Sequence, residues 1–455
     1  MGRYQWGLFI VTGFGYFADN LWPIVTGLIL PAVVAEFKFN GPFLKLGQNI
    51  GLLVGAAFWG VGADIWGRKV SFNLTLLITG VFAIAAGGSP NFVVLTSLVS
   101  VWSVGVGGNL PVDSAIFLEF VPARDQYLLT ILSIWWVFGQ LFGSLYGNPC
   151  PRSENPGWRY FLFTMGGVML ILWAIRFFVF TLYESPKYLM GKGNDQAAVE
   201  TVHKVAAHNR TTTNLTVKDL ECLGVYSPSE GREPPSGNVK NVLKGRLALF
   251  GLDHVKPLFA TRKLAYSTSL LIILWALIGL AFPLYNSFVT FYLSSRGTDF
   301  GDGSVYITYR NQVILSVIGV PGALLAGYMV ELPVLGRRGT LAISTILTGV
   351  FILASTTAMN SNALLGWNCA YSFTSNIMYG VLYTVTPELF PTKDRGTGNA
   401  LTATANRIFG VMAPIIALYA NITTAVPVWI AGAIFLGAGL IALALPYESR
   451  GKASL

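Results

Sequence analysis

The stretch Glu119-Phe-Val-Pro122 returns as Glu388-Leu-Phe-Pro391, 269 residues further along the chain (388 − 119). A second stretch, Gly67-Arg68-Lys69, returns as Gly336-Arg337-Arg338 after the same interval (336 − 67). The dipeptide Glu-Ser at 184 and 448 follows at a spacing of 264 (448 − 184). Three motifs that recur in one order, at nearly one spacing, indicate that the chain consists of two duplicated halves.

The composition indicates that most of the protein surface contacts lipid. Of 455 residues, 53% are hydrophobic and 11% are charged, whereas soluble proteins carry about a quarter charged residues. The mean hydropathy is +0.58. The net charge of +9 comes mostly from basic residues between apolar runs, so nucleic acid is not an expected partner. The three cysteines lie far apart, which argues against a disulfide framework or a metal site, and no cofactor is expected.

Twelve apolar runs are long enough to cross a bilayer core of about 30 Å. They lie near 6–33, 46–63, 70–88, 92–117, 127–147, 159–182, 264–293, 308–330, 340–358, 362–386, 397–420 and 424–446. We therefore expect an all-α membrane protein with twelve transmembrane helices in two pseudo-symmetric six-helix bundles. The expected domains are a first bundle at 1–183, a central loop at 184–263, a second bundle at 264–447 and a short tail at 448–455.

The distribution of Lys and Arg predicts the orientation. With the N-terminus inside, the short inner segments hold ten of these residues and the outer loops and their edges hold six. The central loop, which is also basic, then lies inside, and both termini are cytoplasmic. Within this loop, the helix formers of Asp195–His208 predict a helix.

Four stretches carry a resemblance to a known family. Gly60-Val-Gly-Ala-Asp64-Ile-Trp-Gly67-Arg68-Lys69 resembles the loop signature of the major facilitator superfamily, and Glu184-Ser-Pro-Lys-Tyr-Leu189 resembles a sugar porter motif. The segments around Gly105–Pro111 and Tyr383–Pro391 are similar to the branch that contains synaptic-vesicle-glycoprotein relatives and their fungal counterparts. The resemblance implies a monomeric transporter in a plasma or vacuolar membrane. The substrate stays open, because the branch includes proteins linked to organic acids, organic ions and sugars.

Charged residues inside apolar runs are costly and usually functional. Asp19 lies midway along the first run, Asp113 in the inner third of the fourth, and Arg407 near the middle of the eleventh. We expect Asp19 or Asp113 to bind a coupling proton, and Arg407 to bind an anionic substrate group or to pair with a carboxylate. A permanent structural ion pair is the alternative. Arg176 is expected to extend to the membrane interface, because it lies near the inner end of the sixth run.

A second set of charges falls on the inner loops, where alternating access requires contacts that break in one state. We expect these residues to form a gating network of ion pairs, with positive-inside topology alone as the alternative for the arginines. The set is Asp64, Arg68, Glu119, Arg124, Glu184, Arg337, Glu388, Arg395 and Glu448.

Polar and aromatic residues at mid-helix depth are the candidate substrate ligands. Amides hydrogen-bond and rings stack, so such a set suits a small polar organic molecule. Helix packing and the aromatic belt are the alternative explanation. The candidates beside Arg407 are Asn109, Trp136, Gln140, Trp275, Tyr285, Asn286, Asn376 and Tyr379.

The sequence predicts a secondary active transporter of a small polar organic solute, organic anion or sugar-like, coupled to protons. No P-loop is present, which argues against transport driven by ATP, and no catalytic set appears, so an enzyme is not expected. Two alternatives stay open: a facilitative uniporter of a sugar-like solute, and a nutrient receptor with the same fold that does not transport. The expected partners are the solute, protons and the lipid bilayer.

Overall fold

A computed structural model describes most of the chain. It covers residues 1–122, 125, 128–132, 134–146, 157–191, 194–222, 256–286, 305–329, 332, 335–390, 395–419 and 425–446. Of the expected gating charges, Arg124 and Glu448 lie outside the described residues. Asp64 and Arg395 are described in their backbone only.

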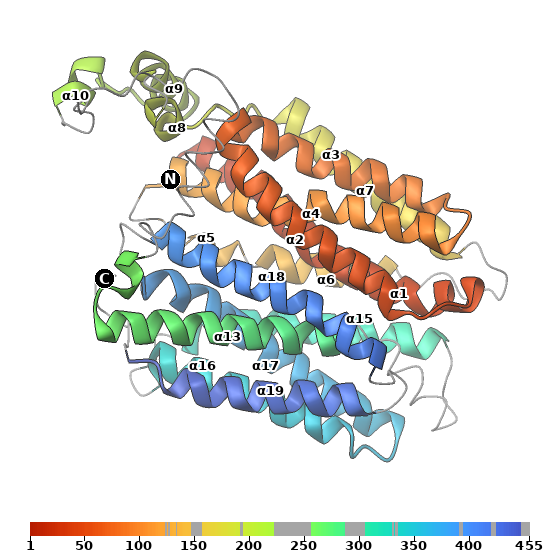
Figure 1. Cartoon of the computed structure of the whole chain (residues 1–455). Helices are drawn as coiled ribbons and strands as arrows, with labels where there is room; N and C mark the ends of the chain where they lie inside the picture. Colours follow the sequence, from red (N-terminus) through yellow and green to blue (C-terminus); the bar gives the residue numbers. More distant parts are fainter. Residues whose placement is uncertain are drawn as a thin grey trace.

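The chain folds into two groups of long helices that lie side by side (Figure 1). The first comprises α1 (Arg3–Phe37), α2 (Pro42–Trp66), α3 (Arg68–Gly87), α4 (Phe92–Phe120), α5 (Leu128–Ile131) with α6 (Ile134–Tyr146), and α7 (Gly157–Ala174) with its π-helical extension η2 (Ile175–Val179). The second comprises α13 (Arg262–Asn286), α15 (Val305–Met329), α16 (Gly336–Ser355), α17 (Ser361–Glu388), α18 (Arg395–Tyr419) and α19 (Val426–Leu443).

The all-helical membrane fold expected from the sequence is confirmed. Nine helices of the described chain are long and apolar enough to cross a membrane, and α6 is a shorter apolar helix. The long helix α2 packs with helices of the first group, and the long helix α17 packs with helices of the second. Within the first half α4 packs on α2 and α3, and within the second half α17 packs on α15 and α16. This correspondence is expected of duplicated bundles.

The duplication extends to the local structure of the helix ends. Gly67 and Gly336, 269 residues apart (336 − 67), both have positive φ, at 102° and 58°, a conformation that glycine adopts without strain. Asn91 caps α4 by accepting from the Val94 N–H at 2.9 Å. Asn360, at the same offset (360 − 91), caps α17 by accepting from the Ala363 N–H at 2.7 Å. The same turn and cap residues therefore start equivalent helices at equivalent positions of the two halves.

Glycine lets the helices of the first half approach backbone to backbone. A Cβ on Gly107 of α4 would lie 2.3 Å from the Leu52 carbonyl oxygen of α2. A Cβ on Gly55 of α2 would lie 2.2 Å from the Val104 carbonyl oxygen of α4. Small residues at such crossings permit the close contact on which helix association in lipid depends. This explains part of the high glycine content.

Three short helices lie beyond one end of the bundle, next to the start of α1 (Figure 1). They are α8 (Pro186–Gly191), α9 (Asp195–His208) and α10 (Val217–Cys222), and the single turn η3 (Lys256–Phe259) precedes α13. The helix expected at Asp195–His208 is present as α9. Asn209 joins it to α1, because its side chain accepts from the Tyr4 N–H at 2.8 Å and donates to Gln5 at 3.0 Å. We call this end of the bundle the α9 end.

Candidate functional site

One ion pair joins the two halves in the middle of the bundle. Arg407 of α18 donates from Nη2 to Asp19 Oδ1 of α1 at 3.1 Å. The side chains are 12% exposed for Asp19 and 22% exposed for Arg407. The pair is therefore largely withdrawn from the surface, and its two charges belong to different halves.

Proline weakens α1 at the turn that carries Asp19. Pro23 lies inside α1 and has no N–H, so the Asp19 carbonyl receives no helical hydrogen bond from this position. Lys45 of α2 is buried and donates to the Pro23 carbonyl at 2.7 Å. Lys45 also donates to Gln48 at 3.2 Å. Helix α1 thus has a built-in bending point beside the ion pair, with one side chain of α2 bonded to it.

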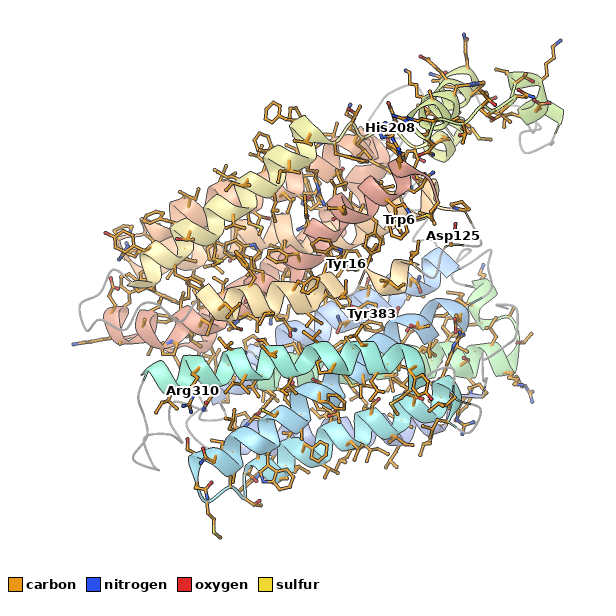
Figure 2. All side chains as sticks on the ribbon, turned by 180° about the vertical axis from the view of Figure 1, so that it is seen from behind. Trp6, Tyr16, Asp125, His208, Arg310 and Tyr383 are labelled. Atoms are coloured by element: carbon orange, nitrogen blue, oxygen red, sulfur yellow. The ribbon has the colours of Figure 1, made fainter. Side chains whose placement is uncertain are left out.

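Five aromatic rings, contributed by both halves, lie near the level of the Asp19–Arg407 ion pair. Tyr16 of α1 lies 5.6 Å from Trp136 of α6, and Trp136 lies 4.4 Å from Tyr383 of α17, between ring centroids. Tyr383 also lies 4.9 Å from Trp275 of α13 and 6.3 Å from Tyr379. Figure 2 places Tyr16 and Tyr383 near each other where the two halves meet, with Trp136 in ring contact with both. We call Tyr16, Trp136, Trp275, Tyr379 and Tyr383 the aromatic cluster.

Several polar groups surround the aromatic cluster. Gln140 of α6 donates to Asn20 of α1 at 3.1 Å, next to Asp19. The indole N–H of Trp275 donates to Thr386 at 2.8 Å. The indole N–H of Trp136, by contrast, is buried and has no acceptor among the described residues. Of the expected ligands, the structure brings Trp136, Gln140, Trp275, Tyr379 and Arg407 together with Asp19.

Asp113 belongs to a different ion pair. Arg176 of η2 donates from Nη2 to Asp113 Oδ2 of α4 at 2.8 Å, and both side chains are fully buried. The guanidinium also donates to the carbonyls of Val11 at 2.7 Å and Phe72 at 2.7 Å, and it lies 3.6 Å from the Phe72 ring centroid. The expectation that Arg176 extends to the interface is wrong, because the carboxylate and two carbonyls bind its head group inside the protein.

Asn109 lies one turn before Asp113 on α4 and is buried. Neither atom of its side-chain amide has a hydrogen-bond partner among the described residues. Gly15 of α1 makes room for both residues, because a Cβ there would lie 1.7 Å from Asp113 Oδ2 and 3.1 Å from the Asn109 Cβ. Asn109 therefore packs beside the buried pair, on the α1 face of α4.

Three expected ligands make their contacts within the second half. The hydroxyl of Tyr285 donates to Asn368, and its ring lies 4.7 Å from the Tyr371 ring centroid. Asn286 is the last residue of α13. Asn376 donates to the Ser372 carbonyl of its own helix at 2.8 Å. These residues lie within the second half.

The motif charges form ion pairs at the α9 end, one in each half. Arg68 pairs with Glu119 at 2.6 Å, and Arg337 pairs with Glu388. The two pairs are equivalent by the repeat (337 − 68 = 388 − 119 = 269). Glu184 accepts from the Arg68 N–H at 3.2 Å. Each of these interactions lies within a single half.

The halves also meet where α2 lies along α18 and where α6 lies along α15. Asn49 of α2 donates to the Gly410 carbonyl of α18 at 2.7 Å. The hydroxyls of Ser144 on α6 and Ser316 on α15 are 2.8 Å apart. Ser144 lies near the last turn of α6, so this contact lies toward the end of the bundle opposite the α9 end.

The family is clear from comparison with known proteins. The model described as Major Facilitator Superfamily matches residues 8–331 and 312–454. The chain belongs to this superfamily. It is therefore an integral multi-pass membrane transporter rather than an enzyme.

Relatives of this superfamily member cover its whole length. The MFS siderochrome iron transporter 1 of Ceriporiopsis subvermispora is 58% identical, over 100% of this chain and 89% of that protein. An uncharacterized MFS-type transporter of Schizosaccharomyces pombe is 50% identical, over 100% of this chain and 86% of that protein. The xylose transporter of E. coli, in a partially occluded inward-open structure, has the same fold, with a TM-score of 0.71 at 15% identity over 98% of this chain and 100% of that one.

Three residues at the site of this transporter are not among those expected from the sequence. Tyr16 and Asn20 are close neighbours of Asp19 on α1, and Tyr383 follows Tyr379 by one helical turn. The available signal was helical spacing, which places side chains on one helix face: Asp19 and Asn20 follow Tyr16 by three and four residues, and Tyr383 follows Tyr379 by four. Arg176 was visible as an arginine within an apolar run, but its distance in sequence from Asp113 concealed the pairing.

Proposed function

We propose that this protein is a secondary active transporter that carries a small organic anion together with a proton. The observation that supports this most directly is the ion pair between Asp19 and Arg407, which joins the two halves at 3.1 Å. In alternating access the halves rock around a central site. A charged pair that bridges them must therefore rearrange in each cycle.

The same reasoning assigns a different role to the second buried pair. Asp113 and Arg176, with the carbonyls of Val11 and Phe72, all belong to the first half. Rocking of one half against the other leaves these contacts intact. We therefore assign proton coupling to Asp19 and a structural role to Asp113.

Charge balance explains how a proton and an anion share the Asp19–Arg407 pair. In the empty carrier the pair is neutral. When Asp19 binds a proton, Arg407 is released and can bind a carboxylate of the solute through two parallel hydrogen bonds. The loaded site is neutral again, so neither form carries net charge through the low-dielectric centre of the membrane.

The motif charges stabilise each half as a rigid unit. Arg68–Glu119 joins α3 to α4, and Arg337–Glu388 joins α16 to α17. We propose that the α9 end is cytoplasmic, in agreement with the Lys and Arg distribution, and that the protein works as a monomer in a plasma or vacuolar membrane. In this topology the Ser144–Ser316 contact belongs to the outer gate.

Crosslinking this outer contact is expected to stop transport. The experiment uses a variant that lacks Cys150, Cys222 and Cys369. In this variant Ser144 and Ser316 are both replaced by Cys, so that two thiols lie where the two hydroxyls are 2.8 Å apart. An oxidant should then reduce solute uptake to about a tenth, because alternating access requires this contact to open. A reductant should restore uptake, and the single Ser144→Cys variant should not respond. Full uptake by the crosslinked protein would contradict a gate at this contact.

The central experiment is uptake into proteoliposomes with an acidic exterior, with protein-free vesicles as the blank. We would test carboxylates, sugars and organic cations. A monocarboxylate should accumulate, alkalinise the exterior and respond to the pH gradient but not to a potassium diffusion potential. Uptake that ignores the pH gradient would favour a uniporter. Binding without uptake would favour a receptor.

A second candidate substrate comes from the relatives. Over its entire length, this chain is 58% identical to a protein that is named a siderochrome iron transporter. Uptake of a ferric hydroxamate chelate such as ferrichrome, labelled with 55Fe, tests this candidate in the same proteoliposomes. Uptake of the chelate without competition by monocarboxylates would replace the small-anion proposal.

A further inference from the structure

The aromatic cluster spans the surface along which the two halves must separate. Tyr16 and Trp136 belong to the first half, and Trp275, Tyr379 and Tyr383 belong to the second. The Trp136–Tyr383 contact, at 4.4 Å between centroids, crosses from one half to the other. Ring pairs of this kind stabilise beyond their buried area. Opening the site in alternating access therefore removes a favourable ring contact, unless another ring takes its place.

The rings lie beside the charges that bind the proton and the anion. Tyr383 is linked to Tyr16 through Trp136, at 4.4 Å and 5.6 Å between ring centroids. Tyr16 is one helical turn before Asp19 on α1. A solute held by Arg407 therefore has aromatic faces next to its carboxylate.

One buried donor also lacks an acceptor at this place. The Trp136 side chain is 8% exposed, and its indole N–H has no partner among the described residues. Leaving such a donor without an acceptor in an interior is costly. A solute oxygen would satisfy it, which would make the N–H a second specific contact besides Arg407.

We infer that the transported solute is a flat aromatic carboxylate. The inference deepens the proposed function and rests on it. The carboxylate binds Arg407 and accepts from Trp136, while the ring replaces the Trp136–Tyr383 contact when the halves open. An aliphatic acid would satisfy the arginine but not the rings. A sugar would lie on the rings but leave Arg407 without an anion once Asp19 is protonated.

Three probes of similar size separate charge from aromaticity. Benzoate has both features, cyclohexanecarboxylate has the charge without the ring, and benzamide has the ring without the charge. We would measure their binding to the purified protein by calorimetry and by the thermal midpoint, which rises when a ligand binds the folded state. Benzoate should bind about tenfold more tightly than cyclohexanecarboxylate. Benzamide should give no measurable shift.

Variants of Tyr383 test whether the cluster makes this distinction. Tyr383→Leu should weaken benzoate binding about three- to tenfold and leave cyclohexanecarboxylate unchanged, whereas Tyr383→Phe should keep the preference. Phe351→Leu is the matched control, because Phe351 stacks on Trp367 within the second half. Trp136→Phe should retain the ring contact and weaken the binding of benzoate through loss of the N–H.

The outcomes distinguish the inference from the proposed function. Equal binding of benzoate and cyclohexanecarboxylate, both lost in Arg407→Gln, would overturn the aromatic solute and leave the anion transporter intact. Benzamide binding as tightly as benzoate would overturn the anion site itself. Binding of neither carboxylate would count against both, since the site would then lack a carboxylate ligand.

Discussion

Replacing Asp19 by Asn is expected to abolish proton-driven accumulation and to preserve exchange of solute across the membrane. For one proton and one monoanion, a gradient of two pH units sustains about hundredfold accumulation. The Asp19→Asn variant should reach a ratio of about one, because an amide does not bind the proton and Arg407 is left free to bind the anion. The measurement is uptake into proteoliposomes with an acidic exterior, followed by counterflow at equal pH on both sides.

Asp113→Asn is the matched comparison, since it removes the other carboxylate of the membrane interior. We expect this variant to yield less folded protein, while the molecules that do fold keep the pH dependence of the parent. A fall in accumulation with Asp113→Asn and none with Asp19→Asn would reverse the assignment of the two carboxylates. Loss of exchange in Asp19→Asn would show that Asp19 binds the solute itself.

Replacing Arg176 by Met is expected to cause the largest loss of stability. The change leaves the Asp113 carboxylate buried without its partner and removes the donors to the carbonyls of Val11 and Phe72. Removing one member of a buried ion pair costs about 3–5 kcal/mol. The free energy of unfolding, from denaturant titration in mixed micelles or bicelles, measures this loss, and the thermal midpoint should fall with it.

Arg159 provides a matched control in the same half. It pairs with Glu36 at 2.8 Å, but its side chain is 24% exposed, so Arg159→Met should cost about 1 kcal/mol. The double variant Asp113→Leu with Arg176→Met should recover part of the loss, because apolar side chains can replace a buried pair. Equal losses for Arg176→Met and Arg159→Met would contradict a structural role of the buried pair.

The sequence determined the fold because the constraints on a membrane helix are local. A bilayer requires about 20 apolar residues per span, and the repeat of Gly67-Arg68 and Glu119 at a spacing of 269 residues (336 − 67) requires two equivalent halves. The same locality identified Asp19, Asp113 and Arg407, because a charge in an apolar run stands out without reference to any other segment. The helix at Asp195–His208 followed from its composition for the same reason.

Only the tertiary structure decided which charges meet. Asp19 and Arg407 are 388 residues apart (407 − 19), and Asp113 and Arg176 come from different helices of one half. Which side chains face each other depends on the rotation of each helix and on close contacts such as that at Gly15. These are set by packing, and packing leaves no periodic signal in a chain that is apolar all round. Tyr16 shares a helix face with Asp19 and Tyr383 shares one with Tyr379, but only the packing of α1, α6 and α17 brings these faces together.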